Sequence, residues 1–224
     1  MRPKDMTIYA VFVLFISSSS FVCAGTIDTV GQASYEQCGY CHEYDGNSRM
    51  PEFPRLAGQH EDYLVKQLND FRSGHRQGVM QATAELLKDE DIHVVAQYFS
   101  QQQFTPVELP KLAAEEQSVA HRLFIQGDQA RALPACVTCH DTQLQVKNVI
   151  PRLSGQHSVY LETQLVAFKR GHRSNDQGGQ MQKIARQLTL TEINALAAYL
   201  ARKKPVSYAR HGNSQRGCKG SKTC

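Results

Sequence analysis

Apolar residues recur at intervals of three and four along much of the chain, which is the spacing of an amphipathic helix. Between residues 63 and 71 the apolar positions form one helical stripe, and residues 160–168 repeat it. Few segments alternate in the manner of a strand. The sequence predicts six helical segments, three in each half: 29–37, 63–71 and 89–99, then 113–126, 160–168 and 191–200. We therefore predict an all-α fold.

The chain is a tandem repeat. The segment Pro-Arg-Leu-Ala-Gly-Gln-His at 54–60 returns as Pro-Arg-Leu-Ser-Gly-Gln-His at 151–157, an offset of 97 residues. Small changes of offset elsewhere mark loop insertions, of which residues 175–180 are the clearest. Each half is long enough for one small domain. We predict domains at 25–103 and 113–201.

The predicted linker between the domains covers residues 104–112. Pro106 and Pro110 prevent a continuous helix through this segment, because proline lacks the backbone N–H that a helix interior needs. A short, semi-extended connection is expected rather than a long flexible one.

The first 24 residues have the pattern of a secretory signal peptide. Arg2 and Lys4 precede nine apolar residues at 8–16, and small residues lead to a cleavage site before Gly25. The apolar run is too short to span a bilayer, which needs about 20 residues. Cys23 leaves lipid attachment open as an alternative, and a retained anchor is the other. Export places the mature protein in an oxidising compartment, in bacteria the periplasm.

Charge is unevenly distributed along the chain. The net charge of +4 is too mild to favour nucleic-acid binding. Residues 25–108 carry a net charge of −7, residues 109–201 one of +3, and the basic tail at 202–224 one of +7. Such a field orients encounters with a redox partner or a membrane surface, and an ordinary solvated surface is the alternative. In the tail, Cys218 and Cys224 suit a small local disulfide, with free thiols or an intermolecular bridge as alternatives.

Two Cys-x-x-Cys-His motifs carry the chemistry. They occupy residues 38–42 and 136–140, which match at an offset of 98. This motif attaches c-type haem: two thiols add to the haem vinyl groups as thioethers, and the histidine ligates the iron. A disulfide or a zinc half-site is the alternative for either motif alone. The pair predicts two covalent haem c groups, with Cys38, Cys41, Cys136 and Cys139 as attachment residues and His42 and His140 as axial ligands.

A thioether sulfur is the expected sixth iron ligand. Met80 and Met181 occupy matching positions in polar loops ahead of the last helix of each half, whereas Met50 has no repeat partner. We predict Met80 and Met181 as the axial ligands. His75 and His172 also match in the repeat and leave ligation by two histidines open, although loop structure or a haem propionate contact suits them better.

Two further repeated pairs suit a haem environment. Pro54 and Pro151 follow the haem histidines by 12 and 11 residues, and their carbonyl groups are predicted to accept the second imidazole proton. Leu56 and Leu153 are predicted to pack on the haem faces.

Repeated cations form a third group. Arg76 and Arg173 are predicted either to pair with haem propionates or to remain solvated loop charges. His60 and His157 are predicted to form local hydrogen bonds at helix starts.

Taken together, these residues resemble the dihaem cytochrome c4 family over nearly all of residues 28–201. The resemblance rests on the two attachment motifs, the doubled Pro-Arg-Leu-x-Gly-Gln segment, the Phe-x-x-Gly-x-Arg segment and a methionine before each closing helix. It implies two tandem class I cytochrome c domains related by a pseudo-twofold axis, with propionates facing across the interface. Glu43 and Asp141 depart from the glycine that the family places after each haem histidine.

The resemblance implies an electron carrier rather than an enzyme. Periplasmic electron transfer toward a haem-copper terminal oxidase is the leading interpretation, with an upstream reductase as the other redox partner and peripheral membrane association open. The alternative is a cytochrome subunit of a larger oxidoreductase, such as a flavoprotein sulfide dehydrogenase. A dihaem enzyme with an open iron position is disfavoured by the matching methionines.

Overall fold

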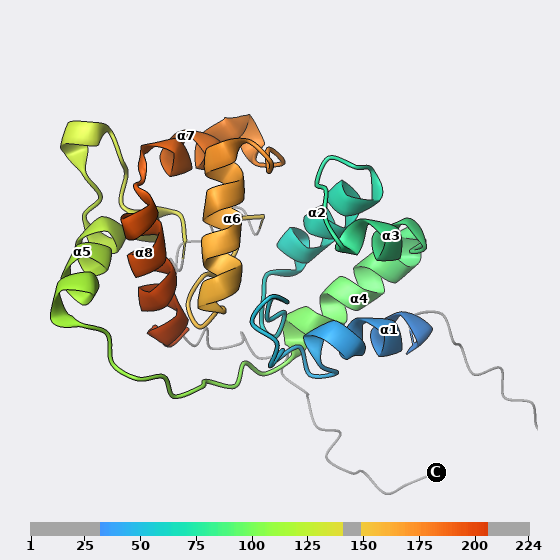
Figure 1. The fold of residues 1–224 in the computed structure, drawn as a ribbon. Helices are drawn as coiled ribbons and strands as arrows, with labels where there is room; N and C mark the ends of the chain where they lie inside the picture. The colour runs from blue at the N-terminus through green and yellow to red at the C-terminus, as the bar shows by residue number, and fades with distance from the viewer. Residues whose placement is uncertain (1–31, 141–148, 206–224) are drawn as a thin grey trace, which may run out of the picture.

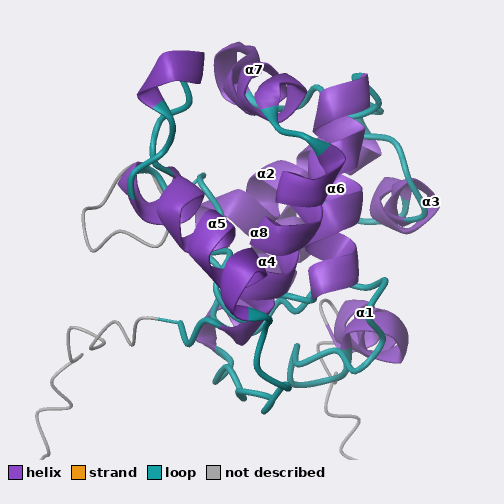
Figure 2. Cartoon of the chain, turned by 60° about the vertical axis from the view of Figure 1, so that its left-hand side comes forward, coloured by secondary structure: helices purple, strands orange, loops and turns teal. Residues whose placement is uncertain are grey.

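A computed structural model describes residues 32–140 and 149–205 of the chain. Within these residues every regular element is helical, and one isolated bridge joins Asp128 and Leu133 (Figure 2). The predicted all-α fold is confirmed. The predicted signal peptide, Asp141, most of the basic tail and both of its cysteines lie outside the described residues. No helix in the described ranges is long and apolar enough to cross a membrane.

In the described part of the first half there are four helices, which lie together at the right of Figure 1. They are α1 (Gln32–His42), α2 (Glu61–Arg72), α3 (Met80–Glu85) and α4 (Asp89–Gln101). Helix α2 packs against α3 and α4, and α1 contacts α4. The apolar stripes predicted from the sequence meet in one core, which includes Leu64, Val95, Phe99 and the predicted attachment residue Cys38.

The second half forms a separate helical group at the left of Figure 1. Its helices are α5 (Ala114–Ile125), α6 (Ser158–Arg170), α7 (Gln180–Gln187) and α8 (Leu190–Arg202), with short 3-10 segments η1 (Gln129–Arg131), η2 (Cys136–Thr138) and η3 (Gln177–Gly179). Helix α8 packs against α5 and α6, while α7 packs against α6. Leu123, Leu161, Ile193 and Leu200 belong to a core of their own.

The structure corrects two sequence expectations. Met80 and Met181 were expected in loops but lie in the first turn of α3 and α7. These helices have six and eight residues, a length at which tertiary packing rather than propensity supplies stability. The first helix was expected to end at residue 37 but continues to His42. Within this helix, the ring of Tyr44 occupies the space that a side chain at position 39 would need. The Cδ1 atom of Tyr44 lies 2.6 Å from an ideal Cβ position on Gly39.

The segment between the two halves is irregular, and the residues at its start contact both halves. Asn47 donates its side-chain amide to the Gln103 carbonyl over 2.9 Å and accepts the Thr105 backbone N–H over 2.8 Å. Arg55 places its guanidinium 5.3 Å from the ring centre of Phe104. That ring also lies against Gly155 of the second half, within 2.3 Å of an ideal Cβ position there. The expected short connection is thus held against both halves.

Helix α8 begins with a capping box that predicts a pH effect on stability. Thr189 and Glu192 exchange hydrogen bonds, and Glu192 also pairs with Arg131 over 2.8 Å. The hydrogen bonds from Arg131 lower the pKa of Glu192 from 4.5 to about 2. Because the folded pKa is depressed, this stabilisation is fully present above the unfolded pKa of 4.5 and is lost as pH falls toward 2.

We therefore expect Glu192→Gln to reduce the free energy of unfolding of the second half at pH 7. The difference from the wild type should shrink between pH 5 and pH 2, as followed by chemical denaturation at a series of pH values. Glu162→Gln, on α6, is the matched control because no pair involves that carboxylate among the described salt bridges. A difference that persists unchanged at pH 2 would contradict the assignment.

Candidate functional site

The two motif histidines hold the same hydrogen bond in both halves. His42 Nδ1 lies 2.8 Å from the Pro54 carbonyl oxygen, and His140 Nδ1 lies 2.8 Å from that of Pro151. A carbonyl oxygen has lone pairs and no proton, so Nδ1 must donate. This tautomer leaves Nε2 with a lone pair, the atom that a metal requires. The predicted role of both prolines is confirmed.

Burial keeps the first of these histidines neutral. Only 3% of the His42 surface is exposed, and desolvation lowers the pKa of its imidazole. His140 is likewise buried, at 7% exposure. Because a protonated imidazole cannot ligate a metal, this environment suits an axial ligand.

The motif cysteines repeat their environments as well as their spacing. Cys38 lies in the second half of α1 and Cys136 opens η2, and burial raises the pKa of both thiols to about 11. Burial disfavours a thiolate but costs a thioether little, because a thioether carries no charge. Each of these two cysteines packs in the same apolar cluster as the leucine predicted to line its haem, Leu56 or Leu153.

The donor set fits covalent haem better than the alternatives. All four motif cysteines are free thiols in this structure. Across the described residues, no three His, Cys, Asp or Glu side chains gather as a metal cage would require. Covalent attachment of c-type haem needs two cysteine thiols and a neutral imidazole of fixed tautomer that directly follows the second cysteine. Both motifs have this arrangement.

The predicted methionine ligands lie on helices that contain neither of the histidines. Met80 begins α3 and Met181 lies at the start of α7, and both are half-buried. Met50 is 37% exposed and belongs to neither helix. His75 is exposed and shares a 2.9 Å hydrogen bond with Ser73, which suits the predicted loop role, and His172 is also exposed.

The two halves meet through a pair of reciprocal glutamine clamps. Gln156 accepts the Arg55 N–H over 2.8 Å and donates to the Arg55 carbonyl over 2.9 Å. Its repeat partner Gln59 does the same with Arg152, over 2.9 and 3.1 Å. Each doubled Pro-Arg-Leu-x-Gly-Gln segment therefore binds the other. The repeat follows a pseudo-twofold relation at this contact.

A second symmetric contact buries two arginines. Arg76 donates to Gln67 over 2.6 Å and to Gln164 over 2.8 Å. Arg173 donates to the same two oxygens, over 3.1 Å to Gln67 and 2.6 Å to Gln164. Tyr160 accepts a further bond from Arg76, over 3.0 Å.

These contacts overturn one sequence expectation. The two arginines are 7% and 8% exposed, so the prediction of solvated loop charges is wrong for both. Contact with haem propionates stays a prediction. The glutamines were visible in the sequence as repeat partners, at 67 and 164, but nothing in the sequence showed that they face one another.

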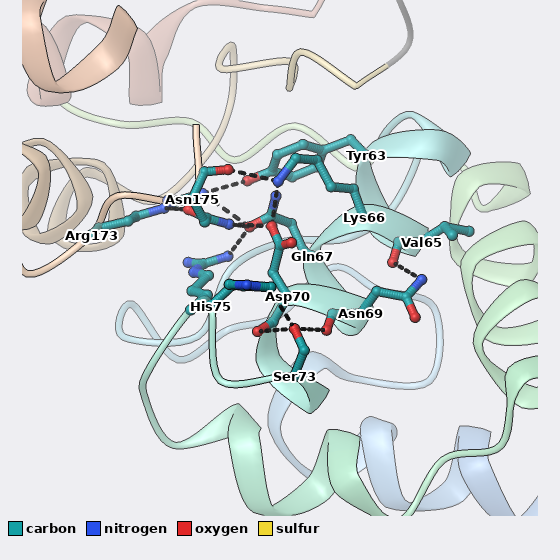
Figure 3. A network of polar contacts seen from close by, with 11 residues as sticks. Tyr63, Val65, Lys66, Gln67, Asn69, Asp70, Ser73, His75, Arg173 and Asn175 are labelled. Carbon is teal, nitrogen blue, oxygen red and sulfur yellow. Dashed lines mark hydrogen bonds and ion pairs between the residues drawn. The ribbon is translucent and has the colours of Figure 1, made fainter. Parts of the chain in front are cut away.

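Figure 3 shows the side of this contact around Gln67, where Asn175 adds hydrogen bonds beside Arg173. Asn175, from the insertion at 175–180, donates to Gln67 over 3.0 Å and to Asp70 over 2.6 Å. Lys66 pairs with Asp70 and donates to the Asn175 carbonyl over 2.6 Å. The insertion thus gives the second half an interdomain contact that has no symmetric counterpart from the first half.

His157 departs from its prediction. It was expected to bond locally, yet its Nε2 lies 2.7 Å from the Ser48 carbonyl oxygen in the other half. Neither His157 nor His60 caps its helix through the side chain. The Ser48 hydroxyl donates in turn to the carbonyl of Cys41 over 2.8 Å. His157 therefore connects the second half to the first attachment motif.

Comparison with known proteins places this geometry in a family. A family model described as Cytochrome c matches residues 124–204. A cytochrome c4 of Pseudomonas aeruginosa is 39% identical over 176 residues, covering 76% of this chain and 85% of that relative. The chain belongs to the cytochrome c4 family. The crystal structure of reduced recombinant cytochrome c4 from Pseudomonas stutzeri has a TM-score of 0.69 at 33% identity, covering 78% of this chain and 98% of the other.

A further relative carries a functional name. A protein of Stutzerimonas stutzeri named thiosulfate dehydrogenase electron acceptor is 36% identical over 167 residues, covering 73% of this chain and 77% of that relative.

Membership in the cytochrome c4 family settles the general chemistry. The fold is two tandem class I cytochrome c domains, and the cofactor is covalently bound haem c. The protein transfers electrons and is not an enzyme.

Proposed function

We propose that this chain binds two haem c groups and carries single electrons between periplasmic redox proteins, delivering them to a haem-copper terminal oxidase. One haem would be held by Cys38, Cys41, His42 and Met80, and the other by Cys136, Cys139, His140 and Met181. The observation that carries the proposal is the matched histidine tautomer, which both Pro carbonyls fix at 2.8 Å. Bound haem supplies one-electron redox chemistry, and the protein sets its potential through ligands and burial.

The clamped halves serve this role by holding the two sites in one arrangement. The glutamine clamps and the arginine contact join residues from both repeats on either side of the pseudo-twofold relation. With haem bound at both sites, a fixed separation would let an electron received at one site pass to the other within the protein.

The first test is a count of haem. We expect a pyridine haemochrome assay on the pure protein to give two haems per chain, none of which acid acetone extracts. Cys38→Ser with Cys41→Ser should leave one, and Cys136→Ser with Cys139→Ser should leave one. A single haem in the wild type would contradict the proposal. Mass spectrometry should find Gly25 as the first residue of the exported protein.

A second candidate is the electron-accepting subunit of a larger oxidoreductase. The relative named thiosulfate dehydrogenase electron acceptor favours this role, and a flavoprotein sulfide dehydrogenase is another such enzyme class. Purification of the exported protein separates the two candidates. A stable complex with a dehydrogenase supports the subunit role, whereas reduction of an oxidase by the free protein supports the carrier role.

A further inference from the structure

Asn175 of the second half is held by residues of helix α2 in the first half (Figure 3). Its side-chain amide donates to Asp70 over 2.6 Å and to Gln67 over 3.0 Å, and its backbone carbonyl accepts from Lys66 over 2.6 Å. On the other side, Arg173 Nε donates to Asn175 Oδ1 over 2.9 Å. A carboxylate can only accept a proton and a guanidinium can only donate one, so these contacts fix which way the amide points.

The next residue carries this contact to the second predicted methionine ligand. The Asp176 carboxylate accepts the Met181 backbone N–H over 2.6 Å and a weaker bond from the Gln182 side chain over 3.4 Å. Met181 lies in the first turn of α7, where backbone N–H groups have no partner within the helix. Asp176 supplies that partner. A continuous path of hydrogen bonds and one peptide bond therefore runs from α2 of the first half to Met181.

The second half has the longer approach to its methionine. Met80 follows Arg76 by four positions, whereas Met181 follows the corresponding Arg173 by eight. Each added residue must be ordered for the methionine to hold one position, and ordering costs conformational entropy. The two residues that make the path described above lie in this added stretch. The insertion therefore needs a support that the shorter segment does not.

The repeat also shows that the support is not a requirement of the helix that provides it. At the offset of 97, Lys66 corresponds to Thr163 and Asp70 to Ala167, so the matching helix α6 has neither charge. The side chains of Lys66 and Asp70 are 30% and 16% exposed. A charged pair that is mostly withdrawn from water and also bonds to another domain differs from a solvated surface pair. Its place in α2 is explained by the contact with the insertion.

We propose that Asp70, together with Lys66, is a positioning residue for Met181, so that the first half holds in place the sixth iron ligand of the second. This rests on the proposed function, which makes Met181 that ligand. The effect is specific to one site. The segment before Met80 touches Asp70 through its carbonyl oxygen, which accepts the Arg76 backbone N–H over 2.9 Å and does not depend on the carboxylate.

The test measures how readily each methionine leaves its iron. The ferric holoprotein is titrated with imidazole, which binds where a methionine is displaced, and the loss of near-infrared Met–iron absorption is followed. In a Met80→His background the remaining absorption reports Met181, and in a Met181→His background it reports Met80. The test variant is Asp70→Ala, which introduces the residue found at position 167 in the repeat. Asp62→Ala removes an exposed carboxylate from the same helix and is the matched control.

We expect Asp70→Ala to lower the half-saturating imidazole concentration at the Met181 site by about tenfold, because a charged hydrogen bond that holds the insertion is lost. The Met80 site should stay within about twofold of the unsubstituted background, and Asp62→Ala should change neither site. An unchanged Met181 site would overturn the proposal. An equal change at both sites would assign Asp70 a general structural role and overturn it as well.

A second pair of variants tests the bond itself. Asn175→Asp places two carboxylates against each other and should also ease imidazole binding at the Met181 site. Adding Asp70→Asn restores a donor and an acceptor in exchanged places, and the half-saturating concentration should return to within about threefold of the unsubstituted background. A general loss of folding would not be rescued by the second change, so an exchange that recovers nothing contradicts the positioning role.

Haem content and Met–iron absorption are measured first, which separates this proposal from the proposed function. A wild type without two covalent haems, or a Met80→His variant without Met–iron absorption, overturns the proposed function. A protein with both haems and both Met–iron bonds, in which imidazole binding does not depend on Asp70, overturns the positioning role alone.

Discussion

Met80→His should lower the reduction potential of the first haem by on the order of 0.2–0.4 V, within the span of about 0.8 V that axial ligands cover. A thioether sulfur favours ferrous iron, whereas an imidazole nitrogen is a stronger donor to ferric iron. Met181→His should have the same effect on the second haem. The half-buried position of each methionine at the start of a short helix leaves room for the imidazole without disturbing a fully packed core.

The measurement is a potentiometric titration of each variant, combined with the near-infrared absorption of the Met–iron bond. Each single variant should lose half of that absorption and shift one of two waves in the titration. Met50→His is the matched control, because Met50 is exposed and has no repeat partner. Unchanged waves in Met80→His or Met181→His would show that the ligand is misassigned, and a shift in Met50→His would identify another one.

Helices α2, α4, α6 and α8 could be predicted because each has a continuous apolar stripe over 12 or 13 residues. In each of these helices, the apolar stripe seen in the sequence is the face that packs in the core. Helices α3 and α7 could not, since their six and eight residues offer too few apolar positions to show a period. Their neighbours α2 and α6 supply the contacts that make them helical.

The candidate haem residues were open to prediction for a different reason. The spacing in Cys-x-x-Cys-His is itself a chemical requirement, and the Pro54 and Pro151 carbonyls follow at nearly fixed distances in sequence. The interface between the two halves could not be predicted in this way. Its hydrogen bonds join residues 84–110 positions apart, such as Tyr63 and Arg173. The repeat shows which residues correspond, but correspondence does not show that they face each other.

His157 illustrates the same limit. Its repeat partner His60 also follows Gly and Gln in sequence, so both were given one local role. The pseudo-twofold contact instead brings His157 to the Ser48 carbonyl of the other half. Only the relative placement of the halves decides that bond.

Gly127→Ala should be the most damaging small substitution in the second half. Gly127 is buried and has φ +71°, a left-handed conformation that a Cβ atom disfavours. An ideal Cβ there would lie 2.3 Å from the Leu133 carbonyl oxygen and 2.7 Å from the Ala135 nitrogen. Both contacts are backbone atoms, which cannot rotate away as a flexible side chain does. Left-handed strain and overpacking together should cost about 2–4 kcal/mol.

The damage should reach the haem as well as the fold. Ala135 directly precedes Cys136, so a displaced 133–135 segment moves the attachment motif. We expect a lower denaturation midpoint for the second half, measured by circular dichroism, and loss of Met–iron absorption from the second haem only. Gly171→Ala is the matched control: Gly171 has φ +78°, but no atom lies within 4 Å of its ideal Cβ position. That variant carries the conformational strain alone, about 1 kcal/mol, and should keep both haem spectra. If the two variants prove equally stable, the close approach at Gly127 does not constrain the motif.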